Sequence, residues 1–171
     1  MSSFSPLSMY TASVPVFSAM LKNLARVLDH GEKSAAERKI DPSTLLNARL
    51  APDMFALTRQ VQIATDHAKG ASSRLAGREV PKMEDNEKSF AELQERIEKV
   101  RKLMKDIKPE EFEGADTREV VIRLPQRELR FTGIDYLQRY AIPNFYFHVT
   151  TPYLILRHNG VPVGKTDFLG G

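Results

Sequence analysis

The stretch FAELQERIEKVRKLMKDI, residues 90–107, decides the fold class because its apolar residues recur with helical spacing. They alternate by three and four residues: Phe90, Leu93, Ile97, Val100, Met104 and Ile107. This spacing puts them on one face of a helix and is typical of the seam between antiparallel helices in a bundle. The mixed charges of residues 95–102 indicate a solvated outer face rather than a phosphate-binding patch. Pro109 should end this helix.

Two further helices are predicted on the N-terminal side of this stretch. The first has an apolar face that repeats at i, i+4, i+7 and i+11, made of Phe17, Leu21, Leu24 and Leu28. It includes Pro15 early and should end near Gly31. A turn at residues 41–44 then opens a short accessory helix over 45–50.

The next long helix is predicted to begin at Pro52-Asp53, with Asp53 as its N-cap, and to stop at Gly77. Its core positions keep the same three–four spacing: Met54, Leu57, Val61, Ala64 and Ala68.

After Pro109 the apolar period changes from helical to alternating. Residues 120–124 and 128–131 alternate apolar and polar side chains, which predicts a short hairpin lying against the helices. Residues 132–135 form a capping box for a last helix, which Pro143 and Pro152 should bend. Gly160 should close that helix, with an extended arm after it. The predicted fold is all-α, a four-helix bundle with a short accessory helix and a small β-hairpin before the last helix, in a single domain over residues 1–171.

Composition excludes several classes of function. The chain has no cysteine, so disulfides, thiolate metal ligands and a cysteine nucleophile are excluded. Its net charge of +3 is spread among acidic residues, and no nucleic-acid-binding signature is present. No apolar run is long enough to cross a membrane, and the first residues make a poor signal peptide. We therefore expect a cytoplasmic protein that binds neither nucleic acid nor membrane.

Several segments, in this order, resemble the bacterial family called domain of unknown function 1993. They are SVPVF (13–17), KIDP (39–42), ARLAPDMF (48–55), RQVQIA (59–64), ELRFTG (128–133), PNFYFHVTT (143–151) and LRHNG (156–160). The resemblance covers essentially the whole chain. It implies membership of the DinB/YfiT-like superfamily, whose members are regarded as metalloenzymes, with a four-helix bundle that is often a homodimer. In better-studied members three histidines hold a divalent metal, typically zinc or nickel, and some members transfer or isomerise thiol compounds.

The histidines keep only part of the superfamily's ligand pattern, which is one histidine on the second long helix and a His-x-x-x-His pair on the last. His67 lies on the second long helix and His148 on the last, facing inward. The pair is broken, because Asn144 and Pro152 stand four residues before and after His148. His158 is rotated by about 80° from His148 on an ideal helix, so it does not restore the pair.

Two interpretations of the site stay open. In the first, His67, His148 and a third group, either His158, Asp66 or a carboxylate such as Asp135, hold a metal. In the second, which we favour, His148 is a hydrogen-bonded core histidine and His158 is stabilised by the helix dipole.

We therefore expect a metal-free protein with a degenerate metal site, which binds a small ligand or a partner and needs no cofactor. The expected ligand-binding residues are polar or aromatic side chains beside apolar faces: Arg59, Gln60, Asn144, Tyr146 and His148. The alternative is a zinc- or nickel-dependent enzyme of the thiol-transferase or isomerase type, with His67, His148 and His158 as ligands. No catalytic residue can be assigned, and a homodimer is expected in either case.

Overall fold

Helices make up most of the structure, a computed structural model that describes residues 7–171. The long helices are α1 (Val14–Glu37), α3 (Leu57–Leu75), α4 (Phe90–Lys105) and α6 (Ile142–His158). The shorter helical segments are α2 (Pro42–Leu46), the 3-10 turn η1 (Pro109–Phe112), α5 (Gly133–Asp135), the π-helical turn η2 (Tyr136–Ala141) and α7 (Lys165–Leu169). Strands β1 (Glu119–Leu124) and β2 (Arg127–Thr132) form one antiparallel hairpin. The prediction of a mostly helical fold with a small hairpin before the last helix is confirmed.

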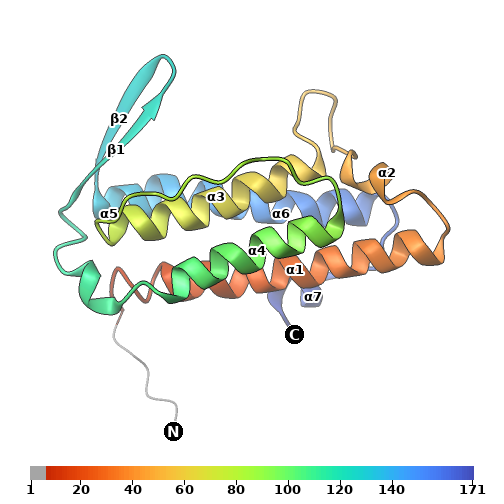
Figure 1. Ribbon diagram of the computed structural model, residues 1–171, viewed down its shortest axis with the longest axis horizontal. Helices are drawn as coiled ribbons and strands as arrows, with labels where there is room; N and C mark the ends of the chain where they lie inside the picture. The colour runs from red at the N-terminus through yellow and green to blue at the C-terminus, as the bar shows by residue number, and fades with distance from the viewer. Residues whose placement is uncertain (1–6) are drawn as a thin grey trace, which may run out of the picture.

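The long helices pack side by side around a common apolar core (Figure 1). Helix α3 lies against α6 and α4, and α1 lies against α4 and α6. Most residues of the predicted apolar stripes are buried: Phe17, Leu21, Leu24 and Leu28 in α1, Leu57, Val61, Ala64 and Ala68 in α3, and Phe90, Leu93, Ile97, Val100 and Met104 in α4. Met54, also predicted as a core position of the second long helix, lies before α3 and is only half-buried. Removing these side chains from water is the main force that holds α3 against α6, the helix pair that carries the candidate site.

Helix α1 does not end near Gly31, as predicted, but continues to Glu37. Gly31 is buried inside the helix, where a Cβ atom would lie 3.0 Å from Leu156 and 3.2 Å from Phe90. The glycine therefore serves close packing between helices and does not terminate α1.

The start of α3 also differs from the prediction. The helix begins at Leu57, after Ala56, and Asp53 does not cap it. The Leu57 N–H donates a 3.0 Å hydrogen bond to the carbonyl of Ala48, which closes residues 48–57 into a loop. That loop brings the Phe55 carbonyl next to the first turns of α3. Helix α2 likewise begins at Pro42, earlier than expected, with Asp41 as its N-cap.

Residues 78–89 connect α3 to α4 without regular secondary structure, and we call them the strap. Gly77, with a φ of 72°, ends the α3 region in the predicted place. Helices α3 and α4 run in the same direction, so the strap crosses the length of the molecule over them (Figure 1).

The hairpin pairs Val120 with Phe131 and Ile122 with Leu129. Val120 and Ile122 are buried, as the alternating pattern predicts. The outer part of the hairpin projects beyond the helices instead of lying along them (Figure 1). At its base, β2 leads directly into the last helical segments, which begin with α5.

The last helix is preceded by a π-helical turn that the sequence pattern did not predict. Thr132 caps the segment as expected, since its hydroxyl accepts a hydrogen bond from the Asp135 N–H. Pro143 has no N–H to give to the Arg139 carbonyl, and its ring crowds that carbonyl. The wider π turn at Tyr136–Ala141 accommodates this proline and displaces Tyr140 from ordinary helical register.

Gly160 closes α6 with a φ of 82°, as predicted. The residues after it are not only an extended arm, because Lys165–Leu169 forms α7 and packs against α1. His30 of α1 lies 3.7 Å from the Asp167 carboxylate there.

No helix within residues 7–171 is both long enough and apolar enough to cross a membrane.

Candidate functional site

His67 of α3 and His148 of α6 face each other across the contact between these two helices. Their ring centroids are 5.7 Å apart and their planes differ by 12°. Both side chains are half-buried, because each lies at the edge of its helix's apolar stripe. Packing of α3 on α6 therefore builds the paired-histidine site, which we define as His67, His148 and Gln60.

Gln60 determines how His148 is held. It is 1% exposed, and its Nε2 donates a 3.1 Å hydrogen bond to the Phe55 carbonyl. This bond turns the amide so that Oε1 lies 2.7 Å from His148 Nδ1. An amide oxygen can only accept, so His148 carries its proton on Nδ1 and keeps a free lone pair on Nε2.

Burial keeps both imidazoles neutral. It lowers the pKa of His67 to about 4, with a smaller contribution from neighbouring His148. Burial also lowers the pKa of His148, assisted by the positive charge of Arg59. At neutral pH the site thus offers two uncharged rings, each with one nitrogen that accepts a hydrogen bond.

Aromatic side chains surround the two rings. The Tyr140 ring centroid lies 6.0 Å from that of His67, and the Phe147 centroid lies 5.1 Å from that of His148. Phe147 is 55% exposed, as is Phe55 at 56%, beside the first turns of α3. The imidazoles therefore lie next to an apolar aromatic surface that is open to solvent.

The other expected ligand-binding residues have different neighbours. The Arg59 guanidinium pairs with Asp85 of the strap and lies 5.9 Å from the Phe55 ring. Asn144 donates a 2.6 Å hydrogen bond to the Tyr140 carbonyl in the preceding turn η2. Tyr146 packs edge-on against Phe145, and at two residues from His148 it points about 200° around the helix from it. Of the expected ligand-binding residues, Gln60 and His148 thus contact each other and Arg59 lies beside them. Asn144 bonds to the backbone, and Tyr146 points to a different side of α6.

The donor set does not fit the divalent metal that the family resemblance implies. His158 is exposed and lies about 15 Å along α6 from His148. Asp66 is engaged by Lys69 and Arg96 at 2.9 and 3.1 Å. Within residues 7–171, no three His, Asp or Glu side chains are grouped so that they could hold a metal ion. Two imidazoles fall short of the three protein ligands of catalytic zinc sites.

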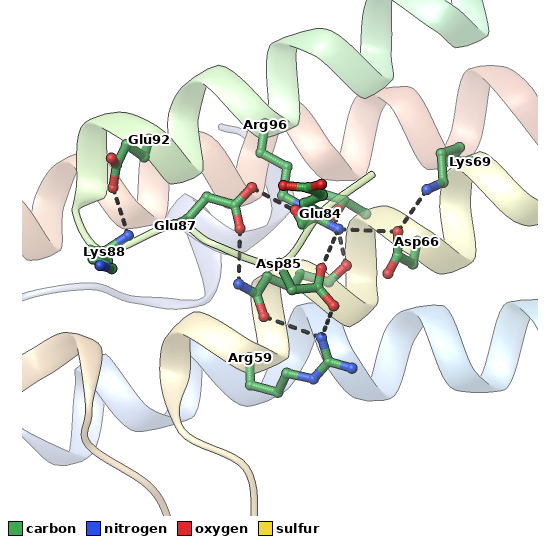
Figure 2. A network of polar contacts seen from close by, with 11 residues as sticks. Arg59, Asp66, Lys69, Glu84, Asp85, Glu87, Lys88, Glu92 and Arg96 are labelled. Atoms are coloured by element: carbon green, nitrogen blue, oxygen red, sulfur yellow. Dashed lines mark hydrogen bonds and ion pairs between the residues drawn. The ribbon is translucent and has the colours of Figure 1, made fainter. Parts of the chain in front are cut away.

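A buried ionic network that the sequence pattern did not reveal lies on the other side of α3 (Figure 2). Arg96 of α4 is 2% exposed, although its surroundings in sequence indicate a solvated face. Its guanidinium pairs with Asp66 at 3.1 Å, Asp85 at 2.9 Å and Glu87 at 3.0 Å. Arg96 follows Leu93 by three residues and so flanks the apolar stripe, which is the one signal that could have identified it.

This network fastens the strap to both helices. Arg96 also donates to the Glu84 carbonyl at 2.8 Å and to the Thr65 hydroxyl at 2.7 Å. Gln62 of α3 donates to Glu87 at 2.8 Å. Since Arg59 holds Asp85 from the other side, the network reaches the edge of the paired-histidine site.

Two grooves of the described surface lie elsewhere. One, of about 860 Å³, runs between the start of α1 and α4 and includes Tyr10, Pro15, Lys99 and Lys102. A second, of about 650 Å³, separates α3 from the strap. Gln60, His67 and His148 line neither of these grooves.

Comparison with known proteins gives a family and a structural neighbour. The family model described as domain of unknown function (DUF1993) matches residues 9–169. A crystal structure of a DinB family member protein from Shewanella denitrificans is similar with a TM-score of 0.87 and 46% sequence identity, covering 95% of this chain and 92% of that one. No curated protein matches the chain.

Proposed function

The chain belongs to the family of domain of unknown function 1993, and we propose that its paired-histidine site binds a small organic ligand without a metal ion. We also infer that α1, α3, α4 and α6 form a four-helix bundle of the DinB kind, which their pairwise packing supports. This scaffold holds His67 and His148 on two helices whose separation is set by the core.

One observation carries the proposal: the hydrogen-bond chain from the Phe55 carbonyl through Gln60 to His148. It fixes the imidazole rotation and leaves Nε2 as an acceptor. A ligand with an O–H or N–H group can therefore donate to a nitrogen that needs no reorientation on binding.

The surroundings indicate the kind of ligand. Phe147 and Tyr140 offer aromatic surface beside the neutral imidazoles, and this favours a flat, largely apolar ligand. A ligand of this type buries its ring on the aromatic side chains and places its donor on His148. Because Phe147 is 55% exposed and a small probe makes few contacts, we expect weak affinity for small probes, on the order of millimolar.

Phenol and anisole form a matched pair of probes, since the two rings are alike but only phenol can donate a hydrogen bond. In NMR titrations of isotope-labelled full-length protein, phenol should shift the His67 and His148 signals saturably, and anisole should bind more weakly. His148→Ala should remove the preference for phenol. His158→Ala, an exposed histidine on the same helix, is the control and should leave it unchanged. Equal binding of both probes, or an unchanged preference in His148→Ala, would rule out the proposed acceptor.

Metal content tests the other half of the proposal. Freshly purified, tag-free protein measured by inductively coupled plasma mass spectrometry should contain far less than one zinc or nickel per chain. One metal per chain, lost on His148→Ala, would overturn the metal-free proposal. It would favour the alternative, a divalent-metal-dependent enzyme that transfers or isomerises thiol compounds.

A further inference from the structure

A groove of about 650 Å³ lies between α3 and the first half of the strap. Its α3 wall is charged, with Asp66, Lys69 and Arg74. Its strap wall, residues 80–84, combines three apolar side chains with one cation and one carboxylate. The groove does not include the residues of the paired-histidine site. Because it combines cations with apolar side chains, it suits a different kind of ligand.

Lys69 is a buried cation that lines this groove. The side chain is 6% exposed, and its ammonium pairs with Asp66 at 2.9 Å. Among the described residues Asp66 is its one polar side-chain partner. An ammonium group has three N–H donors, so Lys69 retains donors for a ligand.

Arg74 also lines the groove, and its guanidinium lies over a glycine. A Cβ atom on Gly70 would lie 2.5 Å from Arg74 Nη1, so the guanidinium occupies space that the glycine leaves open. Nη1 donates a 3.2 Å hydrogen bond to the Tyr136 hydroxyl, its one polar partner among residues 7–171. Most of the five N–H donors of this planar group therefore remain available.

The charges around the groove leave a positive excess. Three cations line it, Lys69, Arg74 and Lys82, against two carboxylates, Asp66 and Glu84. Asp66 is also paired with buried Arg96, so it does not fully neutralise Lys69 (Figure 2).

We propose that this groove binds a small organic anion, whose carboxylate or phosphate group is held by Arg74 and Lys69. The guanidinium suits a bidentate contact with either group, and the ammonium adds a compact charge. The apolar side chains of Val80, Pro81 and Met83 receive the hydrocarbon part of the ligand.

Anion binding should be visible at His67. The Arg74 charge contributes to the low pKa of His67, and an anion on Arg74 offsets that charge. Binding should therefore raise the pKa of His67 above its ligand-free value of about 4. This readout differs from the phenol preference, so either proposal can fail without the other.

The test is an NMR titration of the full-length protein with inorganic phosphate or with succinate, at constant ionic strength set by sodium chloride. Saturable shifts at Arg74 and His67 with either anion support the proposal. Phosphate alone would identify a phosphorylated ligand, and succinate alone a carboxylic acid. Absence of saturation with both anions overturns the proposal.

Substitutions distinguish anion binding in this groove from nonspecific attraction of anions to a protein with net positive charge. Arg74→Gln should weaken binding by about tenfold or more, as expected when a charge-assisted hydrogen bond is lost. Arg74→Lys should restore part of the affinity, because it keeps the charge but not the bidentate fork. Arg157→Gln, at an exposed position on α6, is the charge-matched control. Equal affinities of Arg74→Gln and the control would overturn the proposal.

Discussion

At the scale of single residues, His67 should make the protein's stability depend on pH. Its folded-state pKa is about 4, below the unfolded value of about 6.5. Between these values the unfolded chain binds the proton more readily, so the contribution of His67 to the free energy of unfolding is complete above pH 6.5 and is lost as the pH falls to 4. His67→Gln should remove this part of the pH dependence. Urea unfolding of the parent protein and of His67→Gln between pH 4 and 7 measures this difference. Parallel curves of unfolding free energy against pH would contradict the prediction.

The tautomer of His148 is a second prediction at this scale. Because Gln60 Oε1 accepts from Nδ1, long-range nitrogen–proton NMR spectra should show the proton on Nδ1 at neutral pH. Gln60→Leu removes the acceptor, so the favoured tautomer should shift toward Nε2–H, the usual preference of a free imidazole. A proton on Nε2 in the unaltered protein would contradict the hydrogen-bond assignment on which the proposed function rests.

Sequence patterns predict the helix face on which a residue lies better than they predict its hydrogen-bond partners. His67 and His148 are placed correctly because helical spacing fixes the face on which each residue lies. The contact of Gln60 with Phe55 depends on a loop closed by the Ala48 carbonyl, and no local pattern indicates a hydrogen bond of that kind. The apolar stripes, the hairpin and the cap at Thr132 follow from local chemistry alone.

At the scale of elements, Arg96 should be the residue that holds the strap. Arg96→Met removes the buried guanidinium that Asp66, Asp85 and Glu87 share. Because Asp66 and Asp85 are 37% and 34% exposed and keep Lys69 and Arg59 as partners, the loss should be about 2–3 kcal/mol of unfolding free energy. Arg101→Met, on the same helix, removes only the pair with exposed Glu98 and should cost less than about 1 kcal/mol.

Hydrogen exchange distinguishes a local from a global effect of Arg96→Met. Amides of residues 78–89 should lose protection more than those of α1, because the strap depends on this arginine for its attachment. Equal stability of the Arg96 and Arg101 variants would show that the network does not hold the strap.

Elements also meet at glycines, where a side chain cannot fit. A Cβ atom on Gly133 would lie 1.7 Å from the Ala115 carbonyl oxygen, which is backbone and cannot rotate away. Gly133→Ala should therefore destabilise the protein by about 3 kcal/mol or more, as in severe overpacking. Gly114→Ala is the control: it meets no atom within 4 Å, and its φ of 66° should cost only about 1–2 kcal/mol. Thermal unfolding compares the two, and a larger loss for Gly114→Ala would contradict this account.

The strap and the π turn show why longer connections escape a sequence-based prediction. Residues 95–102 do present a solvated face, through the exposed side chains of Glu95, Glu98, Lys99 and Lys102, but the strap contacts Arg96 and buries it. The π turn depends on Pro143, whose effect on the preceding turn was predicted only as a bend. The burial of Arg96 depends on contacts from the strap, and the π turn depends on a shift in helical register before Pro143. The spacing of apolar residues in the sequence reveals neither.

At the scale of the whole molecule, we expect the chain to form a homodimer through α6. Phe147 and Leu154 lie one heptad apart on this helix and are 55% and 42% exposed. Large apolar side chains on one helix face favour association, since pairing two such faces removes them from water. Light scattering coupled to size-exclusion chromatography should give twice the 19.4 kDa chain mass.

The same apolar face borders the paired-histidine site, because Phe147 packs on His148. Phe147→Ser should weaken both the dimer and phenol binding, whereas Leu154→Ser should weaken only the dimer. Light scattering and the phenol titration of the two variants separate these roles. A dimer of unchanged stability in both variants would place the interface elsewhere, and a monomeric parent protein would refute self-association through α6.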